Sequence, residues 1–322
     1  MSTSRRSVLI GAAALAAARP SLAQPRYPTR PIEMIVAFPA GGGTDIGARS
    51  VARFMERHLA ESARIGVINR HGAGGEVGWT SLATSRNDGY TIGFINAPAI
   101  VSMTIEKQTR FNIDSFDPIG NLVYDPNVLI VHKDSDFNNL ADMIAYARAN
   151  PGALTIGTTG APGNSEHLAL LQVQIKTSVT FNHAPFSGTA PLKTAILGRH
   201  VPVGAMSISE TLQDAREGKV KILGIMADER HRWAPNVATF REQNIDVIAG
   251  SWRAIVAPRG VAEPILAQLR EALRKAVADP EYIASSEQAL VPLAYLDGPA
   301  LGASLRRMHA ELTEVWQRTP WR

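Results

Sequence analysis

The chain has 322 residues, of which 45% are hydrophobic and 19% are charged. This composition is typical of a folded globular protein and excludes a disordered or fibrous chain. Because the length exceeds that of a usual single domain, we expect two lobes. The sequence contains no cysteine, which excludes a disulfide framework, a thiolate metal site and a cysteine nucleophile.

An export signal is predicted at residues 1–23. Arg5 and Arg6 precede an alanine-rich apolar run at residues 8–18, and the small residues that follow predict cleavage after Ala23. The run is too short to span a bilayer. The paired arginines are compatible with twin-arginine export and with ordinary Sec export, and both stay open. We therefore expect a soluble protein in the periplasm.

The charge balance is nearly even once this signal is set aside. The whole chain has 33 basic and 29 acidic residues, and residues 1–23 hold three of the arginines and no acidic residue. The mature chain therefore has 30 basic and 29 acidic residues, a net charge of +1 instead of +4. Such a balance gives no reason to expect nucleic acid as a partner.

Short apolar segments alternate with helical patterns from residue 32 onward, which predicts an α/β fold of parallel sheets with crossover helices. Strands are predicted at residues 32–38, 65–69, 91–96, 128–131, 154–157, 179–183, 201–206, 220–226, 253–257 and 291–295. Helices are predicted at residues 45–59 and 140–149, and three amphipathic helices follow residue 260. Pro280 and Pro299 fall at two of these helix starts, where proline is tolerated.

Two long extended passages, at residues 117–131 and 246–260, are predicted to carry the chain between two lobes. Residues 125–250 then form one lobe, and residues 24–124 and 251–322 form the other. Paired crossings of this kind make a hinge, with the ligand cleft between the lobes. Trp252 and Phe186 are expected to line the hinge or the core.

A glycine-rich loop, "FPAGGGTD", joins the first predicted strand to the first predicted helix. Successive glycines can gather several backbone N–H groups at one spot, to which the helix adds its free N–H groups and positive dipole end. We expect an anion there, such as a carboxylate or a phosphate, and either Thr44 or Asp45 as the N-cap. The candidate binding residues are Phe38, Pro39, Ala40, Gly41, Gly42, Gly43, Thr44 and Asp45.

A second loop of this kind, "HGAGGEVGW", follows the next predicted strand and precedes another helical stretch. Because neighbouring parallel strands end at the same edge of a sheet, the two loops are expected to face one crevice. One glycine turn before a helix is common and weak evidence, whereas two in tandem favour a ligand site. The candidates added here are Gly72, Ala73, Gly74 and Gly75, together with Asn96 at the end of the third strand.

Two loops of the second lobe, at residues 156–167 and 183–191, are rich in hydroxyl groups, amides and glycine. They offer hydrogen-bond donors without a general base, which is typical of a clamp on a ligand. Taken singly, each serine or threonine is more often a helix cap than a ligand contact. The candidates in this lobe are Thr158, Thr159, Gly160, Asn164, Ser165, Ser187 and Ser207.

A dinucleotide-dependent enzyme is the alternative that the glycines leave open. Their spacing in residues 41–47 is close to some dinucleotide-binding fingerprints, and Asn69 with Arg70 could meet a 2′-phosphate. Against it, no Tyr-x-x-x-Lys pair is obvious, and export places the chain where nicotinamide cofactors are scarce. No Gly-x-Ser-x-Gly nucleophile motif is present, so we expect no catalytic residue and no cofactor. No metal is expected either, because no metal-ligand spacing is formed by His71, His167 and His183.

Several stretches, in the same order along the whole mature chain, resemble the Bug/TctC family: "AFPAGGGTDIGARSVARFM", "NRHGAGGEVGW", "IGTTGAPGNSEHLAL" and "APFSGTAPLKTAILG". That family comprises extracytoplasmic solute-binding receptors of tripartite tricarboxylate transporters. The resemblance implies a two-lobed periplasmic-binding-protein fold of type II-like form. It also implies that residues 39–45 and 72–75 hold one ligand carboxylate through main-chain amides, partly through ordered water. Thr158, Thr159 and Ser165 would contact the distal part of the ligand.

Four positions or motifs depart from the usual family pattern. Ala40 and His71 stand where prolines are common, and Ser187 stands where a lysine is common. Residues 198–202 replace the usual Gly-Gly-x-Val-Asp. We expect proximal carboxylate binding to survive these changes. The altered distal pocket leaves open whether the ligand is a simple dicarboxylate or tricarboxylate.

The sequence therefore predicts an exported, non-enzymatic solute-binding protein that acts as a monomer. It would capture a small organic carboxylate by hinge closure and deliver it to membrane transporter subunits of the tripartite tricarboxylate type. An exported ligand-sensing receptor, or an enzyme on a similar scaffold, stays open as the alternative.

Overall fold

The structure, a computed structural model, describes residues 27–159 and 162–321. The predicted export signal and the candidate Gly160 lie outside these residues. Within the described ranges, no helix is long and apolar enough to cross a membrane.

The first lobe is built on three parallel strands in the order β2-β1-β3. The elements are β1 (Ile32–Val36), α2 (Gly43–Glu56), β2 (Ile65–Asn69), η1 (Ala73–Gly75), α3 (Glu76–Ala83), β3 (Thr91–Ala97), α4 (Ala99–Glu106) and η2 (Ile113–Ser115). The strand β1 is almost wholly buried, as expected for a parallel strand covered by helices on both faces. Both glycine-rich loops leave this sheet from the same edge, at the carboxyl ends of β1 and β2.

The second lobe repeats this arrangement around β5, which pairs in parallel with β6 and β7. Its elements are α5 (Leu140–Ala149), β5 (Thr155–Thr159), α6 (Ser165–Thr177), β6 (Asn182–Phe186), α7 (Thr189–Leu197), β7 (Val203–Ser207), α8 (Ile208–Arg216), β8 (Val220–Ile225) and η3 (Arg241–Gln243). The helix predicted at residues 140–149 coincides with α5. Phe186, expected in the hinge or core, packs against this lobe's apolar core.

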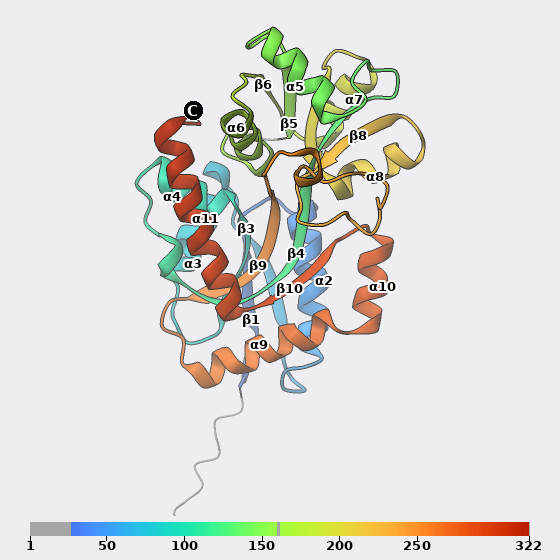
Figure 1. The fold of residues 1–322 in the computed structure, drawn as a ribbon. Coiled ribbons are helices and arrows are strands. Elements are labelled where there is room, and N and C mark those ends of the chain that lie inside the picture. Colours follow the sequence, from blue (N-terminus) through green and yellow to red (C-terminus); the bar gives the residue numbers. More distant parts are fainter. Residues whose placement is uncertain (1–26, 160–161, 322) are drawn as a thin grey trace, which may run out of the picture.

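Two long strands, β4 (Phe116–His132) and β9 (Gly250–Pro258), lie side by side where the lobes meet (Figure 1). Both passages predicted to be extended are therefore strands. The strand β4 pairs with β9 and β10 in one sheet and with β7 and β8 in the other. Tyr124 lies opposite Trp252 in the β4–β9 ladder, with ring centroids 5.1 Å apart. Trp252 thus lies at the crossing, as expected.

The sheets are mixed, which corrects the prediction of parallel sheets. Parallel pairing is found within β1–β3 and within β5–β7, whereas β4 pairs antiparallel with β7, β8, β9 and β10, and β3 pairs antiparallel with β9. The cause is topological: the chain crosses between the lobes in opposite directions, so adjacent crossing strands must run antiparallel.

The chain ends with three helices on the first lobe. They and the last strand are α9 (Glu263–Val277), α10 (Pro280–Gln288), β10 (Leu293–Asp297) and α11 (Gly298–Arg318). Pro280 and Pro299 lie in the first turns of α10 and α11, as predicted. In Figure 1, α11 runs along the side of the molecule from the first lobe toward α6.

Each sheet covers its own group of buried apolar side chains, represented by Ile32 in the first lobe and Leu129 in the second. A further cluster joins the lobes, because Leu168 and Leu171 of α6 pack with Trp321 near the C-terminus. The division of the chain after residues 124 and 250 stays a proposal.

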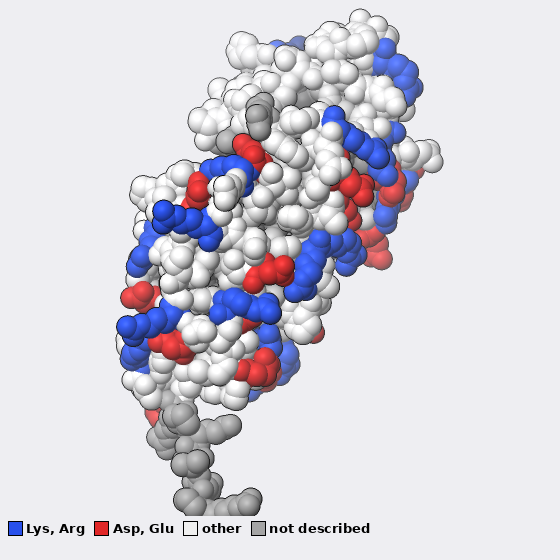
Figure 2. Space-filling model, turned by 90° about the vertical axis from the view of Figure 1, so that its left-hand side faces the viewer, with Lys and Arg blue, Asp and Glu red and all other residues white. Residues whose placement is uncertain are grey.

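Surface charges of both signs are interspersed on the face shown in Figure 2, mainly over its lower part. Such a mixed surface gives this face no continuous basic stripe for a nucleic acid backbone.

Candidate functional site

A cavity of about 480 Å³ lies between the lobes, at the carboxyl ends of β1, β3 and β5. This volume is in the range of small-molecule sites. The first lobe contributes Phe38, Thr44, Gly74, Asn96, Ala97, Pro98, Ala99, Ser102, Met103, Glu106 and Ser251. The second contributes Thr159, Pro162, Gly163, Asn164, Ser165 and Glu166. The predicted residues brought together here are Phe38, Thr44, Gly74, Asn96, Thr159, Asn164 and Ser165.

The helix α2 points an uncapped N-terminus toward this cavity. Its N-cap is Gly42, which has no side chain to satisfy the first-turn N–H groups. The prediction of Thr44 or Asp45 as the N-cap is therefore wrong. The helix begins earlier, and the Thr44 hydroxyl accepts a hydrogen bond from Asn96 Nδ2 at 3.2 Å. Free N–H groups and the positive helix end favour an anion beside Thr44.

The second glycine loop is a run of left-handed backbone. The φ angles of Gly72, Ala73, Gly74 and Gly75 are 140°, 47°, 69° and 109°. At Gly75 a Cβ would also lie 2.8 Å from the Trp79 ring, so both conformation and space require glycine. Gly74 lines the cavity, while Gly72, Ala73 and Gly75 build the turn beside it and do not line it. The uncapped helix α3 begins directly after this turn.

Asp45 lies behind the first loop and not in the cavity wall. Its side chain is buried, and Oδ2 accepts hydrogen bonds from the Gly41 N–H at 2.9 Å and from Arg49 Nε at 3.1 Å. Oδ1 accepts from Asn69 Nδ2 at 3.0 Å. The hydrogen bond from Arg49, above all, lowers the pKa of Asp45 to about 2. The loop thus already binds one carboxylate, that of Asp45. The backbone N–H of Gly41, which was predicted to bind the ligand, donates to Asp45 instead.

The rest of the first loop is exposed. Pro39, Ala40, Gly41, Gly42 and Gly43 lie at the surface beside the cavity and are not part of its lining. Their backbone is therefore reachable from solvent, in contrast to the buried Asp45.

Two buried polar atoms near the start of α2 have no hydrogen-bond partner among the described residues: Asn96 Oδ1 and Arg253 Nε. Asn96 and Arg253 lie opposite each other in the β3–β9 ladder, so both side chains leave the sheet on the same face. A Cβ on Gly43 would lie 3.9 Å from Arg253 Nη2, which places the guanidinium beside the first turn of α2. Unpaired buried polar atoms are rare in folded proteins. The sequence patterns did not indicate Arg253, because it lies in the returning strand β9, far along the chain from both glycine loops.

In the second lobe, much of the predicted donor set is used within the protein. Thr158 is buried outside the cavity, and its hydroxyl is 2.7 Å from His183 Nε2. Asn164 caps α6 by accepting from the His167 N–H at 2.8 Å, and its Nδ2 donates to the Thr159 carbonyl. Thr159 and Asn164 therefore line the cavity, but the amide of Asn164 is already engaged.

Three further predicted residues of this lobe have different positions. Ser165 lines the cavity and accepts from Asn127 Nδ2 at 2.8 Å. Ser207 is buried and forms a capping box with Glu210 at the start of α8. Ser187 is exposed before α7 and outside the cavity lining.

His167 and His183 stack on each other, with ring centroids 3.9 Å apart and an interplanar angle of 6°. Burial lowers the pKa of both, for His167 to about 4, so the pair is neutral at physiological pH. No group of His, Asp and Glu side chains in the described part of the chain is arranged to hold a metal ion.

Two acidic side chains that the sequence patterns did not indicate also line the cavity. Glu106 at the end of α4 is half-buried, and Glu166 in the first turn of α6 is 6% exposed. Burial raises the pKa of Glu166 to about 8, and the charges of Glu210 and Asp125 act in the same direction. An acidic residue in a first helical turn is common, so only its burial distinguishes Glu166.

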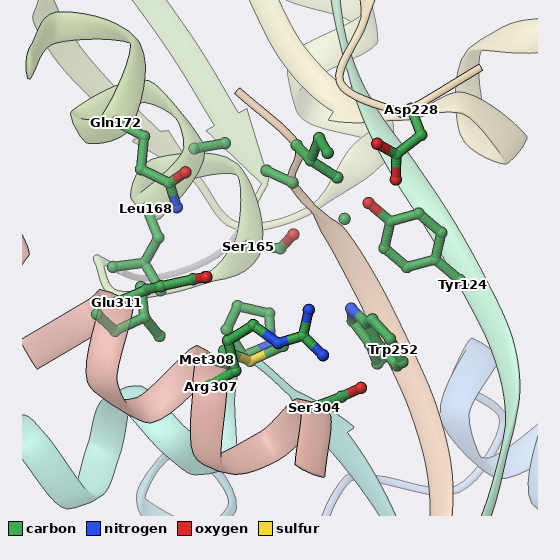
Figure 3. A pocket seen from close by; sticks show the side chains of 16 residues that line it. Tyr124, Ser165, Leu168, Gln172, Asp228, Trp252, Ser304, Arg307, Met308 and Glu311 are labelled. Atoms are coloured by element: carbon green, nitrogen blue, oxygen red, sulfur yellow. The ribbon is translucent and has the colours of Figure 1, made fainter. Parts of the chain in front are cut away.

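A second cavity, of about 330 Å³, adjoins the first at the crossing strands (Figure 3). Ser165 and Pro98 line both cavities. Figure 3 shows Arg307 of α11 pointing into it, with Tyr124 and Trp252 on the opposite wall. Of the predicted binding residues, Ser165 also belongs to this second cavity, whose remaining walls come mainly from α6, α11 and the crossing strands.

Comparison with known proteins gives consistent matches. A sequence model of the TctC family, described as tripartite tricarboxylate transporter family receptor, matches residues 47–296. Protein BugT of Bordetella pertussis is 31% identical over 78% of this chain and 77% of its own. A TctC solute binding protein from Polaromonas has a TM-score of 0.82 at 32% identity, covering 91% of this chain and 99% of that one. MatC from Rhodopseudomonas palustris, solved with bound malate, has a TM-score of 0.73 at 25% identity, covering 90% and 99%. The fold in common is the two-lobed architecture predicted from the sequence.

Proposed function

The chain belongs to the TctC family of tripartite tricarboxylate transporter receptors, and we propose that it captures a small organic carboxylate between its lobes. Similar proteins are solute-binding proteins, and MatC is described with bound malate, a small carboxylate. We propose a binding protein and not an enzyme, because the similar proteins are solute-binding proteins.

The observation that carries this proposal is the unpaired hydrogen-bond donor Arg253 Nε beside an uncapped helix. A ligand carboxylate there would accept from the Arg253 guanidinium and from the first N–H groups of α2. Gly74 opposite lets a ligand approach the backbone closely. The proximal carboxylate would thus be held mainly by the first lobe, at the position that the family resemblance implies.

Closure of the lobes would complete the site. The first lobe, residues 24–124 and 251–322, would grip the carboxylate. The second lobe, residues 125–250, would add Thr159 and Ser165 from across the cavity. Bending at the crossing strands β4 and β9 is the motion that two-stranded connections allow, and a ligand that contacts both lobes favours the closed state. A partner protein could then distinguish the closed, ligand-bound state from the open, empty one.

That partner is proposed to be the membrane part of a tripartite tricarboxylate transporter. In this scheme the protein is exported to the periplasm, acts as a monomer, needs no metal or cofactor and binds no nucleic acid. Co-purification of the ligand-loaded protein with the membrane subunits tests the delivery step. Equal association of loaded and empty protein would contradict the idea that closure is what the transporter recognises.

Binding itself is tested with mature protein, residues 24–322, in a thermal-shift screen of small carboxylates followed by calorimetry. For any carboxylate that binds, Arg253→Met should weaken affinity about 10- to 100-fold, because a hydrogen bond to a charged group contributes about 1.5–3 kcal/mol. Arg307→Met, which removes a cation from the adjoining cavity, is the matched control and should leave affinity unchanged. Equal effects of the two variants, or chemical turnover of the bound compound, would overturn the proposal.

A further inference from the structure

Among the residues that the structure describes, the cavity proposed to take a carboxylate is lined by two acidic residues and by no basic one. Glu106 and Glu166 are its ionisable wall residues, and no lysine, arginine or histidine is found among the described residues of its lining. The cation proposed to meet the carboxylate is Arg253, which lies beside α2 on the first-lobe side. The two ends of the site therefore differ in charge.

Glu166 is the buried member of this pair. It lies in the first turn of α6, lines the cavity and is 6% exposed. Its carboxyl is hydrogen-bonded by its own backbone N–H and by the Thr159 hydroxyl. No lysine or arginine forms an ion pair with Glu166 in the described part of the chain, and a carboxyl this buried is normally paired.

Two more carboxylates stand near Glu166. Asp125 of β4 is 1% exposed and accepts from the Ser209 hydroxyl at 2.5 Å. Glu210 of α8 accepts from the Thr189 hydroxyl at 2.5 Å, at the start of α7. Both act electrostatically on Glu166. The second-lobe side of the cleft thus gathers carboxylates around the place where the distal end of a ligand would lie.

In the described part of the chain, the charges that act on Glu166 are acidic, although Arg253 partly offsets the charge of Asp125. Arg253 of β9 acts on Asp125, and its guanidinium lies toward Gly43. His167, the next residue of α6, and His183 of β6 are held neutral by burial. Glu106 of α4 adds a further negative group on the first-lobe side of the cavity.

A second carboxylate on the ligand would lie near these carboxyl groups and oppose ionisation of Glu166, whereas a protonated nitrogen would favour ionisation of Glu166 and pair with it. We propose that the ligand carries a cationic nitrogen at the end distal to its carboxylate, and that Glu166 is the residue that recognises it. The ligand class is then a small zwitterion, a carboxylate joined to a protonated amine. This inference rests on the proposed function, since it assumes that Arg253 and the α2 N-terminus take the carboxylate.

The recognition is coupled to a proton. In the empty site burial raises the pKa of Glu166 to about 8, so Glu166 is largely protonated at pH 7. A cationic nitrogen favours the ionised form, so its binding releases a proton, and its affinity should increase as the pH rises from 6 to 8.5. A distal carboxylate favours the protonated form, so its affinity should decrease over the same range.

The test compares 4-aminobutanoate, glutarate and pentanoate, whose matched chains end in an ammonium, a carboxylate and a methyl group, with shorter and longer homologues of each. We expect an ω-amino acid to bind tightest and its affinity to rise with pH. Glu166→Gln should weaken it about 10- to 100-fold and remove the pH dependence, because an amide cannot ionise. The same substitution should leave the affinity for the dicarboxylate unchanged or increase it.

Glu106→Gln is the matched comparison, since it removes a half-buried carboxylate from the same cavity. It should change the ratio of affinities for the ω-amino acid and the dicarboxylate less than threefold. The inference is overturned if dicarboxylates bind tightest or if affinity for the amine decreases as the pH rises. It is also overturned if Glu106→Gln, and not Glu166→Gln, removes the preference for the amine. A panel in which no carboxylate of any kind binds overturns the proposed function itself, and the two failures are thereby distinguished. The pH profile of the unaltered protein decides the matter even if a variant folds poorly.

Discussion

Replacing Glu166 by glutamine should make the empty protein more stable at neutral pH. Burial raises the pKa of Glu166 from 4.5 to about 8, so at pH 7 the folded protein keeps a proton that the unfolded chain releases. The stabilising contribution of a raised carboxyl pKa is complete below pH 4.5 and is lost as the pH rises toward 8. At pH 7 the loss spans 2.5 pH units above 4.5, which corresponds to about 3 kcal/mol at ~1.4 kcal/mol per unit. Glutamine keeps the shape and the hydrogen bond to Thr159 without this loss.

The measurement is denaturant and thermal unfolding of ligand-free protein and Glu166→Gln at pH 7 and at pH 4. We expect the variant to gain about 2–3 kcal/mol at pH 7, or about 3–5 °C in Tm, and nothing at pH 4. Glu106→Gln, which removes a half-buried carboxylate of the same cavity, should change the free energy of unfolding by less than about 0.5 kcal/mol. No gain at pH 7, or an equal gain at both pH values, would refute the reasoning that the cavity holds an energetically unfavourable carboxyl.

Further outcomes follow from other parts of the site. Gly75→Ala should cost about 2–4 kcal/mol in thermal unfolding, because its φ is 109° and the new Cβ would lie 2.8 Å from Trp79. Gly74→Ala, strained in φ alone, should cost about 1–2 kcal/mol, and equal losses would contradict the role of the Trp79 contact. Asp45→Asn should lower the free energy of unfolding by about 1–2 kcal/mol at pH 7, because Arg49, which is half-exposed, holds the pKa of Asp45 near 2. This loss of stability should disappear as the pH falls from 4 to 2, where Asp45 itself becomes protonated. A loss that stays constant with pH would exclude a charge effect.

Local patterns located most elements because each buries a face of its own. The helix at α5 and the proline starts of α10 and α11 were predicted from spacing alone, and the crossing strands from the lack of helical periodicity. Strand direction was not predictable in this way. Whether β9 runs parallel or antiparallel to β3 depends on the path of the chain between the lobes, and no short window of sequence contains that information.

The site was predictable where it is made of strand ends. Thr44, Gly74, Thr159 and Ser165 meet at one cavity because each lies at, or shortly after, the carboxyl end of a strand. The polar groups that distinguish the site were missed, because their role depends on burial. Arg253 is one of many arginines until the ladder places it beside Asn96.

Some candidates have internal partners for the same reason. Asn164 is engaged as the cap of α6, and Ser207 is engaged in the capping box of α8. A hydroxyl or amide at a helix start can serve either a ligand or the helix, and only the surrounding contacts decide between them.

The buried carboxylate of Asp45 has a consequence for how the binding site is distributed over the chain. Because the loop before α2 already holds an internal anion, its backbone is ordered before any solute arrives, and binding need not supply the free energy to order it. A loop that is ordered before binding does not adapt to individual ligands, so it suits the carboxylate that all proposed solutes share. Discrimination then falls to the opposite lobe, around Glu166. Exchanging a few residues there should change which ligand is preferred, while binding of the shared carboxylate by the first lobe stays the same. Affinity for the carboxylate and ligand specificity would then lie in different lobes and could be altered separately.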